Sequence, residues 1–139
     1  MIVLDTNVLS ELMKPAPSKQ VIARVAAQPI QSLFTTSITE AEILHGIMLL
    51  PSGRRRRTFE SLAKEMFREE FAGRVLPFDT DAAEPYAHIA SERRRAGRPI
   101  AQFDAQIAAI ARYAGASVAT RNIADFEGCG VELVNPWTR

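Results

Sequence analysis

Asp104 is the residue whose surroundings are hardest to explain without chemistry. At 100° per residue, it lies in the middle of an apolar helix face, opposite Gln102, Gln106 and Tyr113. That face is formed by Ile100, Phe103, Ile107, Ala108 and Ala111. A carboxylate there is costly unless a cation or a set of donors meets it, and the face offers no Lys or Arg. Asp104 therefore either hydrogen-bonds a neighbouring helix end or belongs to a cluster of functional acids.

Asp5 is a second candidate acid. It directly follows the apolar run 2–4, which predicts a strand, so it falls at a strand's carboxyl end. Asp5-Thr6-Asn7 is also a good helix cap, because short polar side chains accept hydrogen bonds from the first turn. Capping and catalysis therefore both remain open for Asp5, and its place at the strand end favours catalysis.

Glu42 is the third acid, on a predicted helix over 37–50. It shares a helix face with Thr39, His45 and Gly46, whereas Glu40 points about 160° away. This spacing predicts that Glu42 points inward to a polar pocket, with a solvent-exposed face as the alternative. Glycine inside a helix costs about 1 kcal/mol relative to alanine, so Gly46 suggests a close backbone approach. His45 either contacts a substrate or metal or makes a structural hydrogen bond, and the second is favoured.

Further oxygen ligands follow the predicted strand 117–120. Asn122 and Asp125 lie there, although either also suits a turn or cap. Three or four converging carboxylates raise one another's pKa values unless a divalent cation neutralises them. Oxygen ligands suit Mg²⁺ or Mn²⁺, and such a site supports water attack on a phosphodiester. Phosphate-binding glycine loops, dinucleotide fingerprints and serine-nucleophile elbows are absent from the sequence.

The composition is that of an ordinary globular protein. The chain has 139 residues, 47% hydrophobic and 24% charged, which predicts one domain over 1–139 and argues against a disordered or repeat protein. With a single cysteine and two histidines, neither an intrachain disulfide nor a zinc cluster is expected. Neither an apolar run of about 18 residues nor a basic signal region is present, so a cytoplasmic location without membrane contact is expected.

Strands and helices are predicted to alternate along the chain. The pattern predicts strands over 2–4, 32–36, 74–78, 117–120 and 131–134, and helices over 8–13, 18–29, 37–50, 58–71, 79–96 and 100–114. The segment 51–57 is predicted to be a turn followed by an arginine run. This alternation predicts an α/β fold with a parallel sheet, helices on both faces and ligands beyond the strands' carboxyl ends.

Five short motifs, in this order and spacing, carry a family resemblance. They are Leu4-Asp5-Thr6-Asn7-Val8-Leu9-Ser10, Glu42-Ile43-Leu44-His45-Gly46, Phe103-Asp104-Ala105 with Ile107-Ala108, Thr120-Arg121-Asn122 with Phe126, and Asn135-Pro136-Trp137. The chain resembles the bacterial PIN-domain toxins of the VapC and FitB type over nearly its whole length. The resemblance implies a PIN-domain three-layer α/β/α sandwich with a central, mostly parallel sheet.

The resemblance also implies an activity and its residues. It implies a Mg²⁺-dependent endoribonuclease toxin of a type II toxin–antitoxin system, with Mn²⁺ as a substitute, that leaves a 5′-phosphate and a 3′-hydroxyl. Asp5, Glu42 and Asp104 would form the catalytic and metal-binding site, with Asp5 and Asp104 as direct ligands. Supporting residues would be Thr6, Asn7, Ser10, Thr120, Asn122 and Asp125. Family members often carry an acid where this chain has Asn122, so one well-occupied metal site is expected without substrate.

Partners follow from the same resemblance. It implies a homodimer and a cognate antitoxin, of which one part binds operator DNA and another occupies the toxin's acidic site. The arginine runs Arg54–Arg57 and Arg93–Arg95, together with Arg121, are hypothesised RNA contacts, with a solvent-exposed helix face as the alternative for the runs.

Two other functions compete with this one. The first is a weakly catalytic or non-catalytic binding module that acts with its antitoxin in operator binding and autoregulation, which Asn122 favours. The second is a phospho-acceptor or phosphatase domain, which requires a second aspartate shortly after Asp5 or a suitably placed lysine; Asp5-Thr6-Asn7 supplies neither.

Overall fold

A five-stranded parallel sheet forms the centre of the molecule. The computed structural model describes residues 1–138. The strands β1 (Ile2–Leu4), β2 (Leu33–Thr36), β3 (Val75–Leu76), β4 (Ser117–Ala119) and β5 (Leu133–Val134) lie in the order β3-β2-β1-β4-β5, with every pairing parallel. Ile2 of the middle strand β1 pairs with Leu33 on one side and Ser117 on the other. The chain leaving β1 at Leu4 therefore emerges between the carboxyl ends of two neighbours, where α/β proteins bind ligands.

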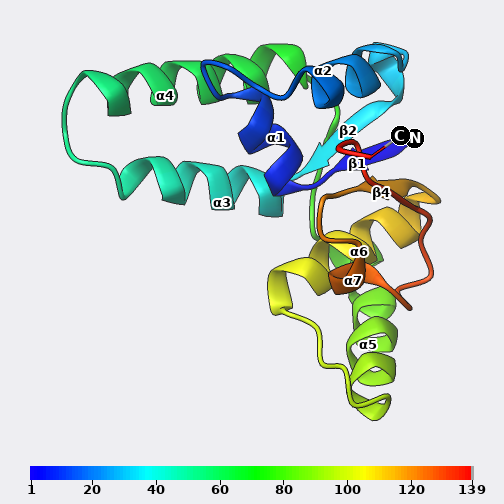
Figure 1. The fold of residues 1–139 in the computed structure, drawn as a ribbon. Helices are drawn as coiled ribbons and strands as arrows, with labels where there is room; N and C mark the ends of the chain where they lie inside the picture. Colours follow the sequence, from blue (N-terminus) through cyan, green and yellow to red (C-terminus); the bar gives the residue numbers. More distant parts are fainter. Residues whose placement is uncertain (139) are drawn as a thin grey trace.

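Helices cover both faces of this sheet (Figure 1). One face carries α1 (Thr6–Leu12), α2 (Lys19–Ala26), α3 (Ser37–Met48), α4 (Arg54–Glu65) and the π-helical turn η2 (Met66–Glu70). The other carries α5 (Thr80–Arg95), α6 (Gln102–Ala114) and the short α7 (Ile123–Phe126), and a 3₁₀ turn, η1 (Ile30–Ser32), precedes β2. The predicted three-layer α/β/α architecture with a parallel sheet is confirmed.

Alternation along the strands divides the core into two layers. Val3 and Val118 belong to the cluster under α5 and α6, whereas Leu4 and Ala119 belong to the cluster under α1 and α3. This follows from the strand period, which sends successive side chains to opposite faces. Within residues 1–138, the helices are too short or too polar to cross a membrane.

The largest departure from the predicted elements concerns the arginine run. Helix α4 begins at Arg54 rather than at residue 58, so the run is helical and not part of a turn. Arginine has a high helix propensity, but four positive charges at the positive end of the helix dipole argue against a helix start. Gly53 precedes the helix at φ 152° and supplies no side-chain cap, so the usual start signal is missing.

The remaining differences concern short elements and boundaries. Strand 74–78 reduces to Val75–Leu76 and strand 131–134 to Leu133–Val134, while the predicted helix 100–114 begins at Gln102. The one-turn helix α7 was not predicted, because four residues carry no periodic signal. Its anchor is Phe126, which is 1% exposed.

Candidate active site

Asp5 lies at the carboxyl end of the middle strand and is 5% exposed. Its backbone N–H donates to the Ala119 carbonyl (2.9 Å), which extends the pairing of β1 with β4. Its Oδ1 accepts from the Thr6 N–H (2.8 Å) as the N-cap of α1. Its Oδ2 accepts from the Thr120 hydroxyl (2.9 Å) and the Asn7 amide (3.3 Å). Asp5 therefore caps a helix and is also fixed in place at the ligand-binding edge of the sheet.

Glu42 reaches the same region from α3. Its Oε1 accepts from the Thr6 hydroxyl (2.8 Å), and this hydroxyl also lies 3.1 Å from the Thr39 hydroxyl. Thr39 is completely buried, and its N–H donates to the Thr36 hydroxyl that caps α3 (3.1 Å). Thr6, the neighbour of Asp5, thus links α1 to α3 and holds the partly buried Glu42 near Asp5.

Asp104 comes from the first turn of α6 and is partly buried. Within residues 1–138, its carboxylate has neither a hydrogen-bond donor nor an ion-pair partner. Burial first, and then the negative charges of Asp5, Asp125 and Glu42, raise the pKa of Asp104 to about 6, although Arg93 opposes this. Burial likewise raises the pKa of Asp5, against the hydrogen bonds from Thr120 and Thr6. The three acids therefore form a site with an excess of negative charge.

These acids line one pocket of about 440 Å³. Its walls are Asp5, Thr6, Asn7, Ser10, Glu11, Lys14, Glu42, Asp104, Arg121, Asn122 and Trp137. Across residues 1–138, no three Asp, Glu, His or Cys side chains come close enough together to hold a metal ion by themselves. Mg²⁺ usually keeps several of its waters and takes only one or two carboxylates. The oxygen donors, the unpartnered Asp104 carboxylate and the excess negative charge therefore fit a hydrated divalent cation, but not a dry three-carboxylate cage.

The turn after β4 completes the polar floor of the pocket. Thr120 is completely buried, and its hydroxyl accepts from the Asn122 N–H (3.1 Å) and the Asn7 amide (3.4 Å) while donating to Asp5. Asn122 lines the pocket, whereas Asp125 is exposed and does not. Asp125 acts on the site at a distance, because its charge contributes to the raised pKa values of Asp5 and Asp104.

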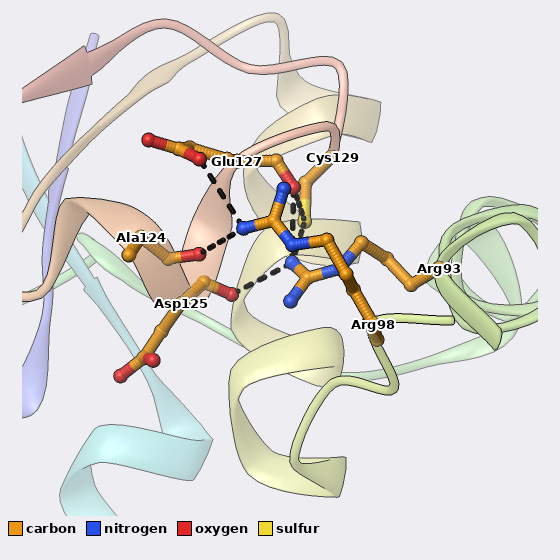
Figure 2. A network of polar contacts seen from close by, with 6 residues as sticks. All are labelled: Arg93, Arg98, Ala124, Asp125, Glu127 and Cys129. Carbon is orange, nitrogen blue, oxygen red and sulfur yellow. Dashed lines mark hydrogen bonds and ion pairs between the residues drawn. The ribbon is translucent and has the colours of Figure 1, made fainter. Parts of the chain in front are cut away.

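A buried arginine holds the segment that carries Asp125 (Figure 2). Arg93, 7% exposed, donates from Nη1 to the carbonyls of Asp125 and Glu127 (2.9 Å each) and from Nε to the carbonyl of Arg98 (2.7 Å). The same Nη1 lies 3.8 Å from the buried Cys129 sulfur. Figure 2 shows the Asp125 carboxylate turned away from this cluster. The hypothesis that Arg93 contacts RNA phosphates is therefore wrong, because its guanidinium is committed to backbone carbonyls.

Three details that the helix periodicity predicts are wrong. Phe103 is 52% exposed and is not part of the buried face of α6, because Asp104 lies near the helix start, at the edge of the core. Gln106, expected opposite, has its Oε1 buried without a hydrogen-bond partner in the described residues. Gly46 and His45 are both exposed, and a Cβ at Gly46 would meet nothing within 4 Å. The close backbone approach expected at Gly46 is therefore absent.

The arginines of α4 differ in what they contact. Arg56 pairs with Glu60 (2.8 Å), and the Arg55 guanidinium lies 5.7 Å from the centre of the Phe59 ring. Arg55 also lines a smaller pocket, of about 250 Å³, that shares Thr6, Ser10 and Glu42 with the acidic pocket. Within the run, Arg55 is thus the arginine that lines a pocket together with Glu42.

Sequence reasoning gave no site role to Trp137, which lines the acidic pocket although it lies 33 residues beyond Asp104 in the chain. Its only signal was the Asn135-Pro136-Trp137 motif at the end of the chain. Arg93 was missed as a structural residue because it sits within a run of three arginines that reads as surface.

The raised pKa of Asp104 predicts how stability depends on pH. Because the folded pKa is about 6 and the ordinary value is 3.8, the folded protein binds more protons between these values. The free energy of unfolding of the metal-free protein should therefore fall as the pH rises through this window. Asp104→Asn should be more stable than wild type near neutral pH by on the order of 1 kcal/mol, and equal to it well below the ordinary pKa of 3.8.

Urea unfolding in the presence of chelator at several pH values measures this difference. Asp81→Asn is the matched control, since Asp81 is an exposed aspartate in the first turn of another helix. If the free energy of unfolding depends on pH equally in wild type and Asp104→Asn, folding does not raise the pKa of Asp104.

Comparisons of the sequence and of the structure with known proteins agree on one family. The family model of the PIN domain matches residues 2–127. The VapC ribonuclease Y4jK of Sinorhizobium fredii is 43% identical over 137 residues, covering 99% of this chain and 98% of that protein. Toxin FitB of Neisseria gonorrhoeae is 37% identical over 137 residues, covering 99% of each. The structure of FitAB bound to an IR36 DNA fragment contains a chain that superimposes with a TM-score of 0.90 at 37% identity, covering 100% of this chain and 97% of that one.

Proposed function

The chain belongs to the PIN-domain family, and we propose that it is a metal-dependent endoribonuclease acting as the toxin of a type II toxin–antitoxin system. The observation that carries the proposal is the meeting of Asp5, Glu42 and Asp104, from three separate elements, in one pocket with excess negative charge. The names of the relatives, a ribonuclease and a toxin, agree with this chemistry. The proposal takes residues 1–139 as a single PIN domain.

Each acid has a defined part in this mechanism. Asp5, Glu42 and Asp104 would hold a hydrated Mg²⁺ or Mn²⁺, with Asp5 and Asp104 as the direct ligands. A bound divalent cation supplies positive charge to phosphate oxygens and lowers the pKa of water. Oε1 of Glu42 accepts a hydrogen bond from the Thr6 hydroxyl, which leaves Oε2 to accept a hydrogen bond from the attacking water. The donors Thr6, Asn7 and Thr120 fix the carboxylate oxygens in advance, so that little reorganisation is needed during reaction.

The proposal is tested by incubating the antitoxin-free protein with bulk tRNA and with a single-stranded RNA. Parallel reactions contain Mg²⁺, Mn²⁺ or chelator. Cleavage that requires a divalent metal supports the nuclease. Tight metal binding, measured by calorimetry, without cleavage of either RNA would contradict it.

A second function has its own observation. Asn122 lines the pocket at the position where the family resemblance implies an acid, and the FitAB complex, which contains a similar chain, is bound to DNA. The alternative is therefore a weakly catalytic PIN module that acts with its antitoxin in operator binding and autoregulation. A promoter fragment that the toxin–antitoxin complex binds much more tightly than the antitoxin alone, together with no RNA cleavage, would favour this alternative.

The proposed antitoxin docks in an apolar groove beside the acidic pocket. An apolar groove of about 910 Å³ lies between α1 and α4, with Leu9, Leu12, Phe59 and Leu62 among its walls. A groove of this size fits an amphipathic segment, which could then extend a basic side chain to the acids. Operator DNA would be contacted only through the antitoxin's DNA-binding part.

Leu62→Glu should weaken antitoxin binding by about tenfold or more, because it puts a charge into an apolar groove. Leu62 is 41% exposed, so the fold should tolerate the change and RNA cleavage should persist. Calorimetry or competition binding measures the affinity. Ile30→Glu is the control, since Ile30 is 69% exposed and lies outside the groove; equal weakening by both variants would remove the groove from the docking site.

A homodimer is part of the same proposal. Leu44, Met48 and Leu49 lie along and just beyond the second half of α3, and all three are exposed, at 37%, 64% and 72%. Large apolar side chains gathered on one surface are typical of protein–protein contacts. Sedimentation of the protein alone measures the association.

A further inference from the structure

The acidic pocket has a second wall of different chemistry. Arg121 and Trp137 line the same pocket as Asp5, Glu42 and Asp104. The guanidinium carbon of Arg121 lies 5.0 Å from the centre of the Trp137 ring, which is a cation–π arrangement. The pocket therefore joins a cation-binding side to a side that offers a planar cation and an aromatic ring.

The backbone of this second wall is fixed. The Arg121 N–H donates to the Asn7 side-chain carbonyl (3.3 Å), so Arg121 is tied to the helix that Asp5 caps. The Asn135 amide donates to the Arg121 carbonyl (3.5 Å), and the Asn135 side-chain oxygen accepts from the Trp137 N–H (2.9 Å). Asn135 thus couples Arg121 to Trp137, and the indole also packs on the core layer under α1 and α3. This wall is held in a constant position relative to the acids.

The charge of Arg121 is available to a ligand. Its side chain is exposed and, within residues 1–138, forms no ion pair, although acids line the same pocket. Glu11, another acid of this pocket, is instead paired with Lys14 (2.9 Å) and accepts from the Ser18 N–H (2.9 Å). Arg121 is therefore a cation placed beside a phosphodiester-cleaving site without a structural ion pair to maintain.

We propose that Arg121 and Trp137 form a nucleotide-positioning wall, on which one base of a single-stranded RNA stacks while Arg121 donates to the adjacent phosphate. Guanidinium planes and aromatic rings are the surfaces on which proteins stack unpaired bases, and arginine also suits phosphate oxygens. A base inside a duplex does not expose its face, so this wall selects single-stranded substrate. The inference rests on the proposed ribonuclease, because it assigns the substrate side of that same pocket.

Trp137 itself provides the readout, because it is the only tryptophan in the chain. The full-length protein, kept in chelator so that no turnover occurs, is titrated with oligoadenylate, with oligouridylate and with a duplex of the two. We expect the indole fluorescence to be quenched by both single strands and to change little with the duplex. Polarisation of labelled RNA reports total binding in the same samples.

Variants separate stacking from charge. Trp137→Ala and Arg121→Gln should each weaken single-strand binding by about tenfold to a hundredfold, the range of one base stack. Trp137→Phe should retain most of the affinity, and Arg121→Lys should keep the salt dependence while losing affinity, since lysine has no planar group. Arg68→Gln is the matched loss of one positive charge at an exposed arginine outside the pocket and outside both arginine runs, and it should bind as wild type does. Thermal unfolding checks that each variant is folded.

Two outcomes would overturn the nucleotide-positioning wall: RNA binding without a change in Trp137 fluorescence, or wild-type affinity in both Trp137→Ala and Arg121→Gln. Its failure differs from failure of the nuclease. If RNA is cleaved with Mg²⁺ and these variants cleave and bind equally well, the wall is wrong and the nuclease stands. If single strands quench Trp137 and the variants bind weakly but no metal supports cleavage, the wall stands and the nuclease is wrong.

Discussion

Asp104→Asn is expected to reduce RNA cleavage by about a thousandfold or more while leaving the protein folded. A metal ion held by carboxylates stabilises the transition state by several kcal/mol. Loss of about 4 kcal/mol of this stabilisation corresponds to a thousandfold lower rate. Asparagine has nearly the shape of aspartate, and the Asp104 carboxylate has no hydrogen-bond donor to lose within residues 1–138. The measurement is kcat/KM on a single-stranded RNA with Mg²⁺, alongside metal affinity by calorimetry.

Asp125→Asn provides the matched control for this prediction. It removes the same charge from the same neighbourhood, but Asp125 does not line the pocket. Its effect on cleavage should stay within about tenfold, the lower end of what outer residues of metal sites contribute. If Asp125→Asn lost as much activity as Asp104→Asn, the net charge of the region, and not ligation by Asp104, would control the reaction.

Asp5→Asn should also inactivate the enzyme, but with the opposite effect on stability. Asparagine caps a helix as well as aspartate does, so the start of α1 should survive. However, the asparagine NH₂ group cannot accept a hydrogen bond. In one orientation it faces the Thr6 N–H, and in the other it faces the Asn7 amide and the Thr120 hydroxyl, so at least one donor loses its acceptor. A lost or unsatisfied hydrogen bond of this kind costs about 1 kcal/mol. Loss of activity with increased stability for Asp104→Asn, and with decreased stability for Asp5→Asn, would show that protein donors already compensate the charge of Asp5, whereas the Asp104 carboxylate is compensated only by a bound cation.

The three acids could be predicted from the sequence because their positions follow from simple periodicities. Asp5 directly follows an apolar strand, and parallel strands place their carboxyl ends at one edge. Glu42 and Asp104 each lie on helices where the 3.6-residue repeat sets their direction. The sequence pattern does not show how deeply each residue of the helix face is buried. Asp104 lies near the start of α6, at the edge of the core, and its neighbour Phe103 is exposed.

The other features depended on contacts between distant residues, which local patterns do not contain. Trp137 reaches the pocket because Asn135 turns the chain end back toward Arg121, through two hydrogen bonds that no spacing rule predicts. The sequence predicts a later start for α4 because like charges at a helix N-terminus are unfavourable, but tertiary packing against α3 overrides this penalty. The sequence predicts a close backbone approach at Gly46, yet a Cβ there would meet nothing within 4 Å.

Arg93 is another residue whose role depends on distant contacts, and its replacement is expected to have a large effect on stability. Within a run of three arginines its burial is invisible to the sequence, yet its guanidinium holds the carbonyls of Asp125, Glu127 and Arg98 (Figure 2). Arg93→Met keeps much of the apolar stem and removes every one of these hydrogen bonds. We expect a loss of about 2–4 kcal/mol in the free energy of unfolding, because hydrogen bonds to charged groups contribute roughly 1.5–3 kcal/mol and the carbonyls left behind are partly buried.

Urea unfolding of Arg93→Met, Arg93→Lys and Arg94→Met measures this contribution. Arg94 is the neighbouring exposed arginine, so its replacement should change the free energy of unfolding by less than about 0.5 kcal/mol. Lysine at position 93 keeps the positive charge, but its single ammonium group cannot reach all the carbonyls that two guanidinium nitrogens of Arg93 reach. The free energy of unfolding of Arg93→Lys should therefore lie between those of wild type and Arg93→Met. Full stability in Arg93→Lys would mean that only the positive charge matters, whereas full stability in Arg93→Met would mean that water replaces the guanidinium. The intermediate result would show that the geometry of one buried arginine positions the segment after β4 beside the acids.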